Sequence, residues 1–200
     1  MESAAMSWLS FLVASFALFV SLVTLWLTHI RLGSIKMTRP SQIYFGPDGG
    51  PSKSGKVFIH TLLYATSFRG RHLEDLYVEV MKSQTSDVFP IWVHGDGEKL
   101  KRGSGLFIGR EGVSVAHHFL KSEDNEPFKF QEGKYKLNVF AKVAGANAPR
   151  LLHSVELNIG QLSPLNFKTE SLTYILIGAQ GHKTTLQKLT PRVETLIGAQ

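Results

Sequence analysis

In YKLNVFAKV, residues 135–143, every second side chain is apolar. The apolar set is Tyr135, Leu137, Val139, Ala141 and Val143, and the positions between them hold Lys136, Asn138, Phe140 and Lys142. Successive side chains of a β-strand point to opposite faces, so this period of two predicts a strand with one buried face.

The same alternation extends outward in both directions. Downstream, LLHSVELNI (151–159) puts one set on a single face: Leu151, His153, Val155, Leu157 and Ile159. Upstream, KVFIHTLLYAT (56–66) and LEDLYVEVMK (73–82) do so with two further sets: Val57, Ile59, Thr61 and Leu63, then Leu76, Val78 and Val80. Each set predicts a strand that is buried on one side.

Shorter strands are expected between and before these segments. We predict one at 88–95, in which Pro90 marks an edge or a bulge because proline cannot donate to the ladder, and others at 41–45, 105–109 and 113–119. About eight or nine short strands with regular turn signals are typical of an all-β protein, specifically a β-sandwich.

The segment EGKYKLNVF (132–140) resembles the penultimate strand of immunoglobulin-like domains. In that strand a turn glycine precedes a tyrosine whose hydroxyl bonds back to the backbone, and the resemblance gives this role to Tyr135. The antibody-type cysteines are absent, so the likeness is to the broad immunoglobulin-like superfamily.

The chain as far as residue 160 also resembles a group of uncharacterised bacterial single-span membrane proteins that carry a small β-sandwich. The segments that carry this resemblance are FGPDGG (45–50), KVFIHTLLYAT (56–66), LYVEV (76–80), IWVHGD (91–96) and RGSGLFIG (102–109). It implies the architecture and no particular activity or site.

A membrane anchor is predicted at the N-terminus. WLSFLVASFALFVSLVTLWLT (8–28) contains no charge, and as a helix it is roughly 31 Å long, the thickness of a bilayer core. Trp8 and Trp26 lie near its ends, where amphipathic rings favour the headgroup level. A core helix would show a broader polar stripe, and a signal peptide would begin with basic residues, which are absent before Trp8.

The basic flank predicts the orientation. Arg31, Lys36 and Arg39 follow the apolar run, and basic flanks stay cytoplasmic. We therefore expect residues 1–7 outside, a single span at 8–30 and a cytoplasmic β domain.

The remaining chain divides by composition. Residues 31–55 read as a juxtamembrane segment with a first strand and a turn, and 56–160 as the sandwich. Residues 161–200 are less patterned and are expected to form a partly flexible tail, with LTYILIG (172–178) as a candidate added strand.

Composition excludes several functions. The chain has no cysteine, which rules out disulfides, thiolate metal sites and cysteine nucleophiles. Its 22 basic and 16 acidic side chains give a net charge of +6, but they are scattered, whereas nucleic-acid binders cluster them on one face. The eight histidines include no H-x-H or H-x-x-x-H pair, so no metal site and no cofactor is expected.

GSGLFIGREGVSVAHHF (103–119) resembles the segment around the catalytic histidine of trypsin-like serine proteases. The resemblance makes His117 or His118 the general base of a hydrolase. A triad also needs a carboxylate and a serine beside an oxyanion hole, and no G-x-S-G-G follows. We therefore expect no catalytic residues and keep the hydrolase as the alternative.

A basic run at 98–105 is the best candidate for an exposed contact. Lys99, Lys101 and Arg102 lie together there, and suit either anionic headgroups or an acidic partner, although a solvated loop has the same composition. The function expected is a membrane-tethered binding or scaffolding module that recruits a protein partner through loops or an edge strand. Homo-oligomers through the span have weak support, because Ser10, Ala14, Ala17 and Ser21 fall short of a G-x-x-x-G motif.

The resemblance of 132–140 to an immunoglobulin-like strand gives a direct test. Tyr135→Phe should remove a buried hydroxyl from its backbone partner and lower the free energy of unfolding by about 1 to 3 kcal/mol. Lys136→Ala should cost little, because that side chain faces the other way. Denaturant melts compare the two, and a larger loss for Lys136→Ala would refute the strand register.

Overall fold

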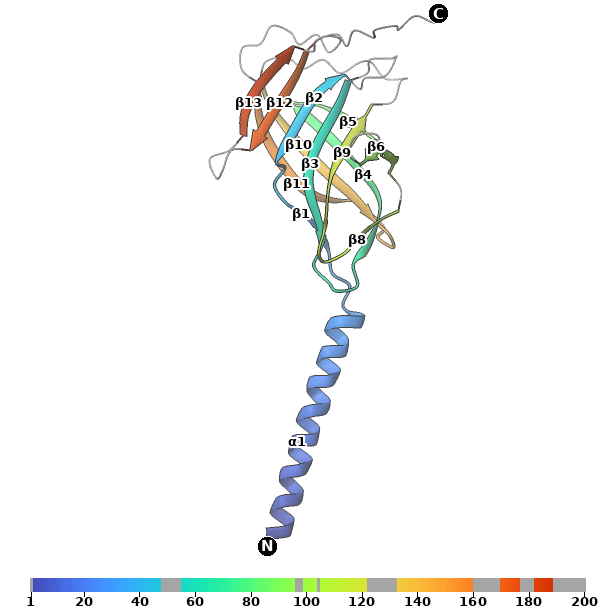
Figure 1. Cartoon of the computed structure of the whole chain (residues 1–200), viewed down its shortest axis with the longest axis vertical. Coiled ribbons are helices and arrows are strands. Elements are labelled where there is room, and N and C mark those ends of the chain that lie inside the picture. Colours follow the sequence, from blue (N-terminus) through green and yellow to red (C-terminus); the bar gives the residue numbers. More distant parts are fainter. Residues whose placement is uncertain are drawn as a thin grey trace, which may run out of the picture.

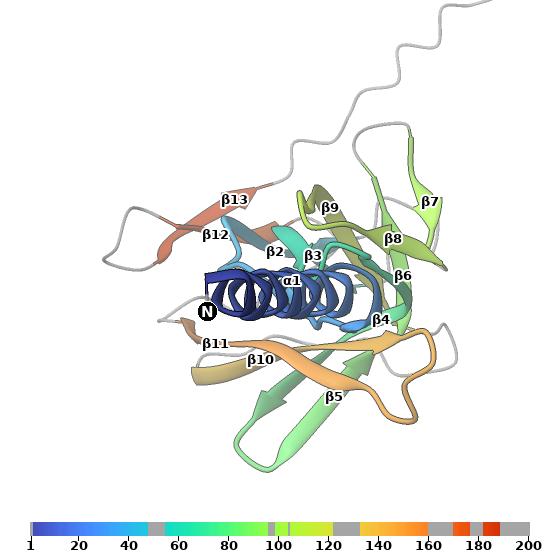
Figure 2. The ribbon, with the colours of Figure 1, turned by 90° about the horizontal axis from the view of Figure 1, so that it is seen from below.

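In the computed structural model, one long helix leads into two antiparallel sheets that pack face to face (Figure 1). The structure describes residues 2–47, 55–95, 99–103, 105–121, 133–159, 170–176 and 182–188. Seen along the helix, the two sheets lie on opposite sides of the helix axis (Figure 2). The chain is thus a rod-like helix with a two-layer β domain at one end.

The helix is long and apolar enough to cross a membrane. It comprises α1 (Glu2–Leu25) and a π-helical turn η1 (Trp26–Ile30), and the window from Ser7 to Ile30 has a mean hydropathy of 2.2 with none of it buried. It is therefore not a core helix of this β domain. The hydroxyls of Ser21, Thr24 and Thr28 donate to carbonyls four residues back at 2.7–2.9 Å, which satisfies them within the helix.

The large sheet contains eight strands. In chain order they are β1 (Ile35–Met37), β2 (Gln42–Pro47), β3 (Gly55–Ala65), β6 (Ile91–His94), β7 (Lys101–Arg102), β9 (Val113–Leu120), β12 (Glu170–Leu176) and β13 (His182–Lys188). Their order across the sheet is β13-β12-β2-β3-β9-β6-β7, and β1 pairs with the end of β3 nearest the helix.

The small sheet contains five strands. They are β4 (Arg71–Lys82), β5 (Thr85–Phe89), β8 (Leu106–Ile108), β10 (Gly133–Val143) and β11 (Arg150–Ile159). The order is β11-β10-β4-β5, and β8 pairs with the first residues of β4. All pairings in both sheets are antiparallel.

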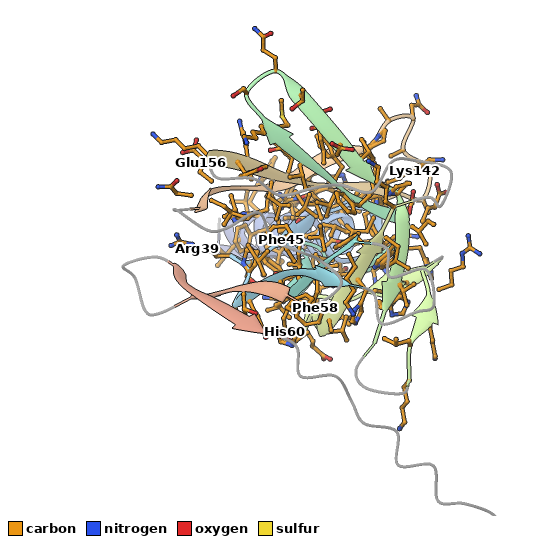
Figure 3. The ribbon with its side chains drawn as sticks, turned by 90° about the horizontal axis from the view of Figure 1, so that it is seen from above. Arg39, Phe45, Phe58, His60, Lys142 and Glu156 are labelled. Atoms are coloured by element: carbon orange, nitrogen blue, oxygen red, sulfur yellow. The ribbon has the colours of Figure 1, made fainter. Side chains whose placement is uncertain are left out.

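The core lies between the sheets, and the predicted alternation supplies it. The expected inward sets of β3, β4 and β10 are all buried: Val57, Ile59, Thr61, Leu63, Leu76, Val78, Val80, Tyr135, Leu137, Val139, Ala141 and Val143. Figure 3 shows Phe45 among the packed side chains, with Lys142 and Glu156 at the periphery. Tyr135 is 3% exposed and Lys136 is exposed, as the strand register predicted. The bond from the Tyr135 hydroxyl stays a prediction.

The single strand predicted at 88–95 is wrong. The chain leaves the small sheet at Phe89, the last residue of β5, and enters the large sheet at Ile91, the first residue of β6. Pro90 lies between them and has no N–H to continue either ladder. The proline therefore marks a crossing between sheets, which its sequence signal does not distinguish from a bulge.

Among the described residues there are thirteen strands, more than the eight or nine expected. The candidate strand at 172–178 is present as β12, which pairs with β2, and β13 returns beside it. The tail predicted at 161–200 thus contributes a hairpin to the large sheet, while its residues 161–169, 177–181 and 189–200 lie outside the described residues.

The inward assignment of Leu151 is also wrong. The β10–β11 register shifts between Val139 and Phe140, so that Phe140 pairs with Leu151. This bulge turns Leu151 outward, where it is 52% exposed, and brings Leu152 against the core instead.

The bulge gives a matched pair of substitutions. Leu152→Ala should lower the free energy of unfolding by about 1 to 2 kcal/mol, because a partly buried side chain is lost from the core. Leu151→Ala should cost less than about 0.5 kcal/mol, because that side chain faces outward. Urea unfolding in detergent micelles, followed by circular dichroism of the sheets, compares them. Equal losses would contradict the bulge.

Candidate interaction surface

His117 and His118, the candidate bases of the hydrolase alternative, lie on β9 and point to opposite faces. His117 is fully buried, and its Nδ1 accepts a hydrogen bond from Trp92 Nε1 at 3.1 Å. His118 lies on the outer face, with its ring centroid 5.0 Å from that of Phe58. A general base must reach the proton it removes, and a fully enclosed His117 does not meet that requirement in this structure.

The environment of His117 holds it neutral. Burial, followed by the nearby histidines His94, His118 and His60, lowers its pKa from 6.5 to about 3. Its Nε2 has no hydrogen-bond partner within the part of the chain that the structure describes. The same part contains no group of three or more side chains suited to hold a metal ion. His117 therefore packs as a core residue joined to Trp92.

The predicted basic run lies at the β6 edge of the large sheet. Lys101 and Arg102 form β7 and are exposed, as is Lys99 just before it. Lys101 pairs with His94 of β6, which pairs with His117 of β9, and His117 pairs with Ile59 of β3. Ile59 is six residues along β3 from Ala65, which lies at the helix end of that strand. Six residues correspond to about 20 Å of strand, more than twice the physiological screening length. Lys101 and Arg102 therefore lie far from the helix end of the sheet.

The outer face of the small sheet carries an apolar row that crosses three strands. Tyr77 of β4 pairs with Phe140 of β10, which pairs with Leu151 of β11. The rings of Tyr77 and Phe140 are stacked, with centroids 5.1 Å apart and planes at 11°. Leu151 is half exposed at the end of the row. We call Tyr77, Phe140 and Leu151 the apolar row.

A hydrogen-bonded polar row lies beside the apolar row, on the side away from the helix. Asn138, only 6% exposed, donates from Nδ2 to Glu79 Oε2 at 3.2 Å and accepts at Oδ1 from Ser154 Oγ at 2.8 Å. The same Nδ2 lies 3.3 Å from Met81 Sδ. Asn138 is thus fixed from both neighbouring strands, which gives this face a rigid polar pattern.

Acidic groups surround the apolar row on β4. The pKa of Tyr77 is raised by burial and then by the charges of Glu79 and Asp75. The pKa of Asp75 is itself raised by burial, against a lowering by the Leu76 amide and by Lys142. Lys142 also forms an ion pair with Glu74 at 3.2 Å. The face therefore combines an apolar centre with charges of both signs.

The outer face of the large sheet differs in exposure. It has its own aromatic row of Tyr44, Phe58 and His118, and all three are half-buried, as Tyr77 and Phe140 also are. The small sheet instead exposes three large apolar side chains on its strands: Val88 (42%), Phe107 (49%) and Leu151 (52%). Among the side chains that the structure describes, the small sheet therefore offers more accessible apolar surface on its outer face.

Sequence reasoning missed this surface. Phe140 is an aromatic residue among the polar positions of 135–143, but a single apolar side chain on a solvated face is ordinary, and only its neighbours across the sheet make it part of a patch. Leu151 gave no signal, because its outward direction depends on the bulge. The buried position of Asn138 depends on two neighbouring strands and had no local signal either.

Comparisons with protein-family models, with curated proteins and with solved structures find no match to this chain.

The low pKa of His117 predicts acid sensitivity. The folded state holds the neutral form, while the unfolded histidine titrates near 6.5, so protonation favours unfolding as the pH falls below that value. Stability should be fully present above about pH 6.5 and fall by about 2 kcal/mol by about pH 5 through this residue alone. Urea unfolding across this range measures the fall.

Two variants isolate the contribution of His117. His117→Gln keeps an acceptor for Trp92 and removes the titrating imidazole. The fall in the free energy of unfolding between about pH 6.5 and pH 5 should therefore be smaller in this variant by the contribution of His117, about 2 kcal/mol. Trp92→Phe removes the donor but keeps the buried imidazole, so it should lower stability at every pH and leave the acid loss in place. An acid loss unchanged in His117→Gln would show that other groups cause it.

Proposed function

We propose that this chain is a membrane-anchored binding module with an immunoglobulin-like sandwich, and that it holds a protein partner on the outer face of the small sheet. The observation that carries the proposal is the apolar row, with Leu151 half exposed at its end. The anchor, the sandwich and the binding face each have separate support.

The strand orders support the immunoglobulin-like assignment. The order β2-β3-β9-β6 in the large sheet corresponds to strands A, B, E and D of that fold. The order β11-β10-β4-β5 corresponds to G, F, C and C′ in the small sheet. In this assignment β12 and β13 extend the large sheet beyond strand A.

The helix supports a single-pass anchor, in which α1 and η1 span the bilayer. Apolar side chains are exposed along its length, including Trp8 (69%) and Trp26 (51%) near the ends of the apolar run. Arg31, Lys36 and Arg39 follow it, so we place the N-terminus outside and the β domain in the cytoplasm. The bilayer is then the first partner of the chain.

The composition of the small sheet's outer face suits a protein partner. Aromatic side chains in a well-packed patch contribute most of the binding energy at protein interfaces, and polar groups around them set specificity. Tyr77 and Phe140 are held rigid by stacking, and Asn138 by its hydrogen bonds, so binding orders few side chains. The partner expected is a protein surface with an apolar centre and charges of both signs around it.

A photo-crosslinking residue at Val88, on the same face, tests this proposal in the full chain in native membranes. One discrete adduct is expected. Leu151→Lys should reduce its yield by about tenfold or more, because a charge then replaces the exposed end of the apolar row. Mass spectrometry of the adduct identifies the partner, and an adduct of two copies of this chain would make the contact a homo-oligomer.

Ser114→Lys is the matched control, because Ser114 is exposed on the outer face of the large sheet. It introduces the same charge and should leave the yield unchanged. Binding through this face is refuted if no adduct forms or if both variants affect it equally.

A further inference from the structure

The junction between helix and sandwich is short and hydrogen-bonded. Only residues 31–34 separate η1 from β1, a reach of at most about 14 Å. Arg69 Nη1 donates to the carbonyl of His29 at 2.9 Å, and Arg71 Nη1 donates to that of Gly33 at 3.2 Å. The Ser34 amide donates to Thr66 Oγ1 at 2.8 Å. One end of the sandwich is therefore held against the end of the helix (Figure 1).

The turns at this end expose apolar side chains. Three of the segments at this end are residues 31–34, the β3–β4 turn (66–70) and the β8–β9 turn (109–112), and we call these three the proximal turns. Phe68 (65%) and Leu32 (64%) lie in them and are the two most exposed large apolar side chains outside the helix among the described residues. Single exposed apolar side chains are ordinary on protein surfaces, so this exposure indicates a contact only together with its place at the helix end and the charges around it.

The proximal turns are also basic. They contain Arg31, Arg69 and Arg110, all exposed, against one acidic residue, Glu111. The guanidinium carbon of Arg110 lies 4.2 Å from the centre of the Phe68 ring, a cation–π contact. An aromatic ring with an arginine on its face suits the headgroup level of a bilayer, where the ring meets apolar chains and the cation meets phosphate.

We infer that the proximal turns are a second membrane contact, in which Phe68 and Leu32 enter the headgroup layer and the arginines bind anionic phospholipids. The inference rests on the proposed span, because a bilayer around α1 and η1 places these turns at its surface. Residues 31–34 follow η1 directly in the chain, and the positive charge of the proximal turns complements anionic headgroups. Both observations favour the lipids of the leaflet from which η1 emerges. The contact differs from the predicted headgroup contact at Lys99, Lys101 and Arg102, which lie far along the sheet.

The chain lacks cysteine, so single cysteines carry environment-sensitive fluorophores without background labelling. Full-length variants Phe68→Cys, Ser86→Cys and Phe16→Cys are labelled and placed in vesicles of phosphatidylcholine with or without phosphatidylglycerol. Ser86 is exposed in β5, near the β4–β5 turn, and Phe16 lies mid-helix. A headgroup-level quencher should quench the label at 68 and leave that at 86 unquenched, with stronger quenching on anionic vesicles.

Charge variants test the electrostatic part in the Phe68→Cys background. Arg69→Gln and Arg110→Gln together should weaken the anionic-lipid preference of the label at 68 by about fivefold per arginine. Lys101→Gln with Arg102→Gln removes the same charge from β7 and should have no effect. High salt should also weaken the anionic-lipid preference of Phe68→Cys with both arginines intact, as the arginine substitutions do. Salt changes no residue, so this result does not depend on a folding defect in the charge variants.

The outcomes separate the two proposals. The membrane contact is refuted if the label at 68 is quenched no more than the label at 86. It is also refuted if the β7 double variant has the same effect as the Arg69→Gln, Arg110→Gln double variant. A label at 16 that a deep acyl-chain quencher does not reach refutes the span itself. Quenching at 16 with none at 68 leaves the span supported and the second contact refuted.

Discussion

Burial of one face of each sheet against the other is the interaction on which the rest of this structure depends. The small sheet contributes Val78, Leu137 and Val139 to this interface, and all three are fully or almost fully buried. The large sheet contributes Ile59 and Phe119, which are buried to the same degree. Each such side chain contributes about 1.5 to 3 kcal/mol when removed from water. Because side chains alternate along a strand, the same packing fixes which residues face outward, including Phe140 and Asn138.

The features that the sequence predicted are those encoded locally. The strands β3, β4 and β10 follow from alternation alone, and the helix follows from a charge-free run of sufficient length. The errors concern non-local pairing. The sheet crossing at Pro90 depends on which strand each flank meets, and the exposure of Leu151 depends on a bulge in its pairing with β10. Similarly, β13 joins the large sheet only through β12.

The candidate surface was hidden from the sequence for the same reason. Its members come from β4, β10 and β11, and only the register places Tyr77, Phe140 and Leu151 in one row. The basic run was visible as composition, but its distance from the helix end depends on three successive strand pairings. Conversely, the arginines of the proximal turns are scattered through the sequence, and the fold collects them at the helix end.

The proposed anchor and the proposed binding face are connected by geometry. Seen along the helix, the two sheets lie on opposite sides of its axis (Figure 2), so with α1 across a bilayer their outer faces look sideways. A partner anchored in the same membrane could then reach the outer face of the small sheet while it stays at the membrane surface. Tethering both proteins raises their effective concentration, and a sandwich fixed at its base loses less rotational freedom on binding. A face of modest apolar area can then suffice for specific binding.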